Sequence, residues 1–136
     1  PICRAYLQDF QELQSEFNDL GVEIIAVSAD SRERAEKSRD EWAVEKIAIG
    51  YGLTREDMRR WNLFASQAIK DSEPKLFAEP ALFLIKSDGS LFYASYSSMP
   101  FGRPRPEDVL KMVKFVEEND YPARGEVRAP VLASQA

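Results

Sequence analysis

The N-terminal stretch carries apolar residues at intervals close to the helical period of about 3.6 positions. The repeating positions are Cys3, Leu7, Phe10, Phe17 and Leu20. This spacing predicts an amphipathic helix with one face turned to a core. Gly21 is expected to end the helix, because glycine readily adopts the left-handed conformation that follows a helix C-terminus. Pro1 suits a first helical turn.

The segment from Val22 to Ser28 is almost continuously apolar and rich in β-branched residues. This pattern predicts a strand that is covered on both faces. A highly charged stretch follows and indicates a solvent-exposed helix from about Ser31 to Trp42, capped by Asp30 or Ser31. Residues 46–52 are expected to form a second, short strand.

Thr54 and Asp57 have the spacing of a capping motif, which predicts a short helix that ends near Trp61. Residues 62–79 show no clear period and are interpreted as a long surface excursion with a helical turn around residues 66–70. Long segments of this kind are either functional or plain insertions, and the sequence leaves both open.

Two apolar runs, Ala81 to Lys86 and Leu91 to Tyr96, flank the dipeptide Asp88-Gly89. Asp-Gly between apolar runs strongly favours a β-hairpin. After a proline-containing loop, Pro106 is placed to open a final amphipathic helix. We therefore expect a folded domain over residues 1–118 and an irregular tail over residues 119–136.

The predicted order is helix, strand, helix, strand, helix, hairpin and helix. A parallel βα portion followed by an antiparallel hairpin and a closing helix predicts an α/β sandwich with a mixed central sheet. Right-handed crossover topology calls for a strand directly before the first helix. We therefore expect the first strand or strands of the sheet to be missing and the chain to be a fragment or processed form.

The composition argues against several kinds of partner and chemistry. The 136 residues carry a formal net charge of −5, with 44% hydrophobic residues. Such a chain is expected to be globular, and its acidic balance argues against nucleic acid or an anionic membrane as partner. There is no His and a single Cys. Imidazole chemistry and most zinc sites are thereby excluded, and chemistry would rest on the thiol, carboxylates, Arg, Lys, Tyr or backbone.

The single cysteine, Cys3, falls in the first turn of the first predicted helix. A helix N-terminus favours a thiolate over a thiol, through its partial positive charge and free backbone N–H groups. Cys3 is thus a candidate for one half of a thiol–disulfide pair. The alternative is a small buried residue that packs on the inner face of the helix.

Arginines offer further candidates. Arg4 could stabilise a thiolate or an approaching oxyanion, or could be a solvated helix residue. Arg103, Arg105 and Arg124 lie in proline-containing segments, and we interpret them as solubilising loop charges rather than as ligands for an anionic substrate or a partner.

Three segments, taken together, resemble a known family. They are the start Pro1-Ile2-Cys3-Arg4, the helix-to-strand run from Leu20 to Asp30, and the hairpin run from Glu79 to Leu91. In this order and spacing they are similar to the peroxiredoxin-like branch of the AhpC/TSA (alkyl hydroperoxide reductase/thiol-specific antioxidant) family, within the thioredoxin-fold superfamily. The resemblance covers roughly residues 1–116 and implies a thioredoxin-like α/β/α sandwich.

The resemblance also implies site residues. Cys3 matches the second, resolving-type cysteine of a Cys-Pro-x-Cys motif, whose attacking cysteine would precede Pro1 and is absent from the chain. Pro1 and Arg4 would shape the site beside the thiol. Pro80 would form a cis Glu79–Pro80 bond next to it. The place where peroxiredoxins usually carry an arginine reads Glu79-Pro80-Ala81.

The implied function is that of an antioxidant oxidoreductase, by thiol–disulfide exchange or hydroperoxide reduction. Its substrate would be a hydroperoxide or a protein disulfide, and a thiol reductant such as a thioredoxin-type protein would restore it. No metal or cofactor is implied, and a cytoplasmic location and a homodimer are compatible expectations. The alternative is a redox-inactive thioredoxin-fold module that binds a protein. The residue encoded just before Pro1 would separate these readings, since Cys favours the enzyme.

Overall fold

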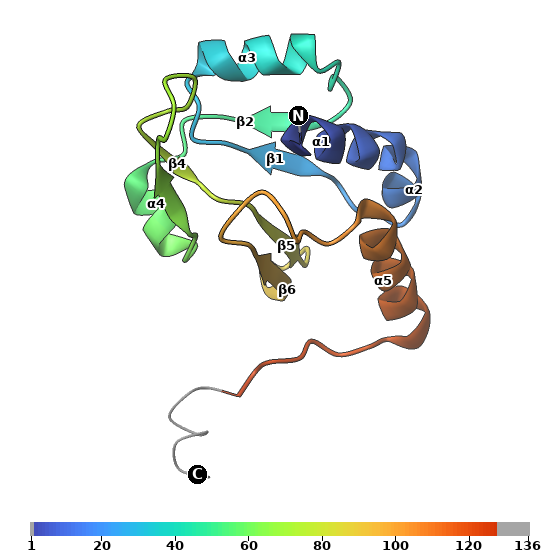
Figure 1. The fold of residues 1–136 in the computed structure, drawn as a ribbon. Helices are drawn as coiled ribbons and strands as arrows, with labels where there is room; N and C mark the ends of the chain where they lie inside the picture. Colours follow the sequence, from blue (N-terminus) through green and yellow to red (C-terminus); the bar gives the residue numbers. More distant parts are fainter. Residues whose placement is uncertain (1, 128–136) are drawn as a thin grey trace.

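The computed structural model describes residues 2–127, so Pro1 and the end of the predicted tail lie outside the described residues. The helices and strands follow the predicted order, except that the first helix is divided and a second hairpin precedes the predicted one (Figure 1). In chain order they are α1 (Ile2–Glu12), α2 (Gln14–Asp19), β1 (Ile25–Val27), α3 (Arg32–Glu41), β2 (Ala48–Gly50), α4 (Arg55–Arg60), β3 (Ala65–Gln67), β4 (Leu76–Ala78), β5 (Ala81–Ile85), β6 (Leu91–Tyr96) and α5 (Pro106–Asn119).

The first predicted helix is present but divided. Leu13 separates α1 from α2, with φ −95° and ψ 1°, and its N–H bonds the carbonyl of Phe10 three residues back. The apolar stripe continues across this break, because Phe10 and Phe17 are both buried, with ring centroids 6.0 Å apart. Gly21 has φ +77° and follows the last turn, as predicted.

Within residues 2–127 the strands pair in three two-stranded sheets rather than in one continuous sheet. β1 and β2 are parallel and joined through α3, whereas β3–β4 and β5–β6 are antiparallel. The predicted mixture of parallel and antiparallel strands is therefore confirmed.

The strand expected over residues 22–28 is shorter and less covered than its sequence predicts. β1 spans Ile25–Val27, and Ile25 and Val27 are 62% and 56% exposed. Side chains alternate between the faces of a strand. The neighbouring positions Ile24 and Ala26 pack against the core, so only one face is covered.

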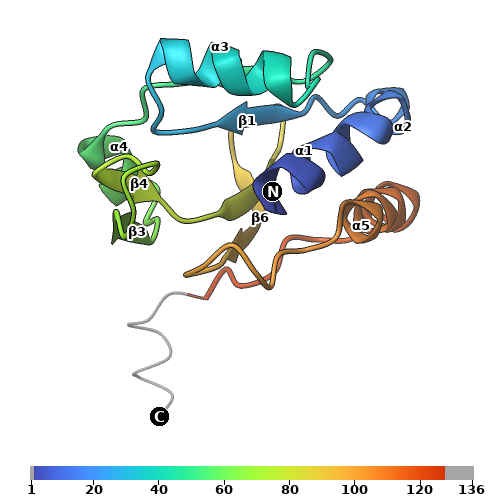
Figure 2. The ribbon, with the colours of Figure 1, turned by 45° about the horizontal axis from the view of Figure 1, so that its top comes forward.

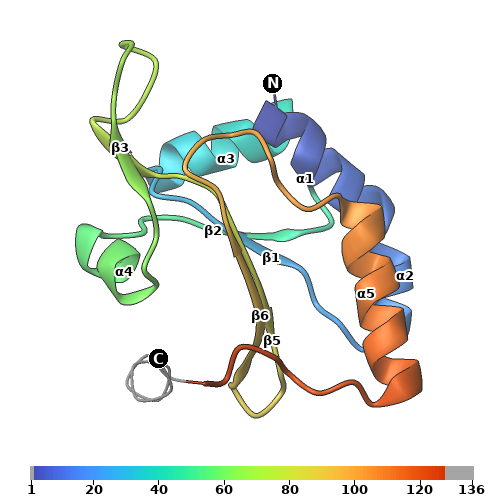
Figure 3. The same ribbon diagram turned by 60° about the horizontal axis from the view of Figure 1, so that its bottom comes forward.

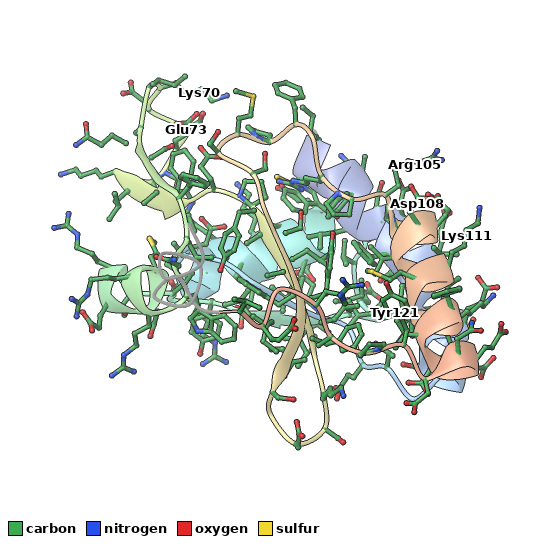
Figure 4. The ribbon with its side chains drawn as sticks, turned by 90° about the horizontal axis from the view of Figure 1, so that it is seen from below. Lys70, Glu73, Arg105, Asp108, Lys111 and Tyr121 are labelled. Atoms are coloured by element: carbon green, nitrogen blue, oxygen red, sulfur yellow. The ribbon has the colours of Figure 1, made fainter. Side chains whose placement is uncertain are left out.

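The structure of residues 62–79 differs from the one expected. The helical turn predicted around residues 66–70 is instead the first strand of the β3–β4 hairpin, in which Ser66 pairs with Phe77. Arg34 on α3 donates to the carbonyl of Ser72 at 2.7 Å and ties the tip of this hairpin to the body of the protein. Lys70 and Glu73 lie at that tip (Figure 4).

The predictions made from local sequence signals are confirmed. The Ser31 hydroxyl accepts from the backbone N–H of Arg34, and Thr54 and Asp57 form a reciprocal capping box at α4. Asp88 accepts from the N–H of Ser90 at 2.8 Å in the β5–β6 turn. α5 begins at Pro106 as predicted and ends at Asn119.

The core lies where α1, α2 and α5 pack against the parallel strands. Figure 2 shows α1 and α5 side by side, with α3 on the far side of β1. The buried cluster comprises Phe10, Phe17, Val44, Ile47, Val109, Leu110 and Val113. This packing fixes α1, and the first turn of α1 carries the candidate thiol.

Candidate functional site

Cys3 lies in the first turn of α1 and its side chain is exposed. No acidic residue shares that first turn. The free N–H groups and positive dipole end of the helix therefore act on the sulfur without an opposing carboxylate on the same turn. The alternative reading, a buried packing residue, does not fit an exposed side chain.

An arginine from the far end of the sequence contacts this sulfur. Nη2 of Arg103 donates to Sγ of Cys3 at 2.9 Å, across a sequence separation of 100 residues. Arg103 lies in the loop between β6 and α5, which arches toward the start of α1 (Figure 3). A guanidinium at this distance stabilises the thiolate by charge and by hydrogen bonding.

Tyr6 holds the same loop from one turn further along α1. The Arg103 guanidinium lies 4.8 Å from the centroid of the Tyr6 ring, and the Tyr6 hydroxyl donates to the carbonyl of Pro104 at 2.6 Å. Burial raises the pKa of Tyr6 to about 12, against a smaller opposing effect of Arg103. The phenol therefore stays protonated and remains a donor at neutral pH.

The loop itself has a defined shape. Gly102 adopts φ +73°, a conformation that favours glycine, directly before Arg103. The hydroxyl of Ser97 lies 2.7 Å from the carbonyl of Met99 and 2.6 Å from that of Phe101. These contacts and the flanking Pro104 restrict the backbone that delivers the guanidinium.

An open hollow of about 330 Å³ adjoins the site, between α1, the loop and the start of α5. Its lining includes Ile2, Tyr6, Asp9, Phe101, Arg105 and Glu107. Apolar and charged side chains of both signs thus surround it. The side chain of Arg105 is exposed and pairs with Glu107 at 3.5 Å; Figure 4 places Arg105 at the start of α5.

Pro80 corrects the expectation of a cis bond. No cis peptide bond occurs in the described residues, so Glu79–Pro80 is trans. The N–H of Glu79 bonds the carbonyl of Phe64 at 2.7 Å, and the extended chain then runs straight from β4 into β5. The Pro80 carbonyl accepts from the N–H of Ser97 at 3.0 Å.

Pro80 still belongs to the neighbourhood of the site. It lines a small hollow of about 20 Å³ together with Tyr6 and Arg103. Arg4 is exposed, and its proposed influence on the thiol stays a prediction. Pro1 lies outside the described residues.

Arg103 is the residue that sequence reasoning ranked too low, because it was grouped with Arg105 and Arg124 as a loop charge. Arg124 instead contacts the hydroxyl of Tyr121, at 3.1 Å. A glycine and two prolines around Arg103, in Pro100-Phe101-Gly102-Arg103-Pro104, were the available signal of a shaped loop.

Within residues 2–127, no helix has the length and apolar character needed to span a membrane. Nor do the described side chains gather three or more Cys, Asp or Glu residues in an arrangement that could hold a metal ion.

Peroxiredoxins are among the solved structures that share this fold. A mutant of peroxiredoxin 6 from Arenicola marina superimposes with a TM-score of 0.67 and 18% identity, covering 98% of this chain and 70% of that structure. AhpC from Mycobacterium tuberculosis gives 0.66 and 18%, covering 94% and 65%. AhpC from Enterococcus faecalis gives 0.69 and 21%, covering 91% and 73%. The chain thus spans only part of each relative's length.

No curated protein sequence matches the chain. A family model does, and its description is "AhpC/TSA family". The match covers residues 1–94, which include α1 with Cys3 and the β5 strand after Pro80. It agrees with the thioredoxin-like α/β architecture and with the peroxiredoxins found by structure. The chain belongs to the AhpC/TSA family.

Proposed function

We propose that this protein is a thiol-dependent oxidoreductase in which Cys3 performs thiol–disulfide exchange. The observation that carries the proposal is the contact between the Arg103 guanidinium and the exposed sulfur at the start of α1. Membership of the AhpC/TSA family supports it.

In the exchange reaction, the Cys3 thiolate attacks one sulfur of a substrate disulfide. A new S–S bond forms between Cys3 and that sulfur, the substrate S–S bond breaks, and the other sulfur leaves as a thiolate. One thiolate of an external dithiol reductant then attacks the Cys3 sulfur of the mixed disulfide and releases the second substrate thiolate. The other thiolate of the reductant attacks the reductant sulfur of the new mixed disulfide, which forms a disulfide within the reductant and releases the Cys3 thiolate. The substrate disulfide is reduced, and the reductant is oxidised to a disulfide.

Cys3 is the only cysteine of the 136 residues, so hydroperoxide reduction needs a second thiol from outside this sequence. That thiolate would take the terminal peroxide oxygen, forming a sulfenic acid and, after protonation, an alcohol. The Cys3 thiolate would then attack the sulfenic sulfur and release water, which leaves a disulfide for the reductant. Cys3 thus has the resolving role in this branch.

The surroundings of Cys3 suit these steps. Exposure of the sulfur admits a second sulfur atom along the S–S axis, and Arg103 stabilises the thiolate both as attacking group and as leaving group. The reductant we propose is a small dithiol protein of the thioredoxin type. A reducing compartment such as the cytoplasm would keep that reductant supplied. A homodimer is compatible with this scheme.

Mutation of Cys3 tests the proposal. We expect thiol-dependent consumption of a protein disulfide or a hydroperoxide by this protein to collapse in Cys3→Ser. Ala5→Ser is the matched control, because it places a hydroxyl on an exposed position of the same helix. Turnover that survives in Cys3→Ser would remove the thiol from the mechanism and would favour a protein-binding role instead.

A further inference from the structure

Tyr6 contacts both the side chain of Arg103 and the backbone of the loop that carries it. Its ring faces the guanidinium, and its hydroxyl bonds the carbonyl of the next residue, Pro104. We propose that Tyr6 is a positioning residue that holds the Arg103 guanidinium on the sulfur of Cys3. The inference rests on the proposed function of Cys3.

Tyr6 makes two separate contacts with a short segment of this loop. The guanidinium carbon of Arg103 lies 4.8 Å from the ring centroid, within the range of a cation–π contact. The hydroxyl bond of 2.6 Å fixes the backbone immediately after Arg103. Cys3 and Tyr6 are three residues apart on α1, so they lie on neighbouring turns of the same helix face. One helix thereby carries both the thiol and the side chain that brings the cation to it.

The Tyr6 ring is itself anchored in the core. It meets the buried ring of Phe10 edge to face, with centroids 5.1 Å apart. The Tyr6 ring therefore packs against the core on one side and contacts Arg103 on the other. This contact restricts the rotamers of the Arg103 side chain, which is long and otherwise costly to immobilise.

Arg103 has little else to hold it. Within residues 2–127 no carboxylate forms an ion pair with Arg103, and its Nε is buried without a hydrogen-bond partner. Asp9 on α1 and Arg105 and Glu107 at the start of α5 are charged groups that line the adjoining hollow together with Tyr6 and Arg103. Tyr93 on β6 is the other titratable group that faces Tyr6.

The test measures the rate at which a neutral alkylating reagent modifies Cys3 as a function of pH. We expect Tyr6→Leu, which removes both contacts, to shift this profile to higher pH by no more than Arg103→Met does, because Tyr6 acts only through Arg103. Tyr6→Phe keeps the ring against Phe10 and loses only the hydroxyl bond, so we expect a smaller shift in the same direction and an intact fold by circular dichroism.

Tyr96→Phe is the matched control. Its hydroxyl also donates to a backbone carbonyl, but to that of Trp61 at the end of α4, at 2.9 Å, and not to the loop of Arg103. We expect it to leave the profile unchanged. In an Arg103→Met background we expect Tyr6→Leu to produce no further shift, because Tyr6 acts through Arg103.

Two results would overturn the positioning role while sparing the proposed function. One is a profile that neither Tyr6 variant moves although Arg103→Met does. The other is an equal shift by Tyr6→Leu with and without Arg103. If Arg103→Met itself leaves the profile unmoved, the contact that carries the proposed function fails first, and the role of Tyr6 falls with it.

Discussion

Replacing Arg103 by Met removes the guanidinium charge and its N–H donors while keeping an unbranched side chain of similar reach. The donor atom lies 2.9 Å from the sulfur of Cys3 in the folded protein. A hydrogen bond to a charged group contributes about 1.5–3 kcal/mol. The sulfur is exposed here, so we take the lower end of this range. Since about 1.4 kcal/mol corresponds to a factor of ten, loss of this contact should make the thiolate of Cys3 about tenfold less favourable relative to the thiol.

The rates follow from this shift. Where the thiol predominates, the thiolate fraction falls about tenfold, but the more basic thiolate is more nucleophilic by about threefold, because nucleophilicity follows basicity with a coefficient of about 0.4–0.5. The variant should therefore react about threefold more slowly at pH values where the thiol predominates, and about threefold faster at high pH where the thiolate predominates. This crossing of the two profiles is the signature of a lost thiolate partner.

The assay follows the intact mass of the protein during reaction with iodoacetamide, which is neutral and so does not itself respond to the lost charge. Arg105→Met is the matched control, because Arg105 belongs to the same loop region, has an exposed side chain and pairs with Glu107 rather than with the sulfur. Profiles of Arg103→Met and the unmodified protein that coincide at every pH would refute the reasoning.

Three predictions concern the scaffold. Phe17 is 1% exposed. Phe17→Ala should therefore lower the free energy of unfolding in urea by about 3–5 kcal/mol, and a loss below about 1 kcal/mol would contradict its place in the core. Gly89 has φ +87° with open space around it. Gly89→Ala should cost about 1–2 kcal/mol through backbone strain alone, and an unchanged urea midpoint would rule that strain out. Hydrogen bonds from the backbone and then the side chain of Thr54 lower the pKa of Asp57. At pH values above the ordinary pKa of an aspartate, ionised Asp57 therefore stabilises the fold. This stabilisation is lost as the pH falls through the lowered pKa of Asp57 in the folded protein. Thr54→Ala should raise the pKa of Asp57 in an NMR titration. An unchanged pKa of Asp57 in this variant would show that the Thr54 hydroxyl does not lower it.

Local sequence signals predicted the parts of the fold whose causes are local. The caps at Ser31 and Thr54 and the turn at Asp88-Gly89 each depend on residues two or three positions apart, and all of them occur where expected. The short β3–β4 hairpin was missed, because it depends on backbone pairing between Ser66 and Phe77 rather than on a periodic pattern.

The candidate site was only partly predictable for the same reason. Cys3 was identified from its place in the first helix turn, which the sequence displays directly. The contact with Arg103 joins residues 100 positions apart and is produced by the packing of α5 and its preceding loop against α1. The cis bond at Pro80 was expected from resemblance, whereas the Glu79–Pro80 bond is trans in the structure.

The most direct test of the central claim is the rate at which Cys3 forms a mixed disulfide with a small disulfide such as oxidised glutathione. The measurement compares the folded protein with the same protein unfolded in urea, at neutral pH, by intact mass. The account predicts faster exchange in the folded protein, because folding brings the helix N-terminus and Arg103 to the sulfur. Equal or slower exchange in the folded protein would contradict it.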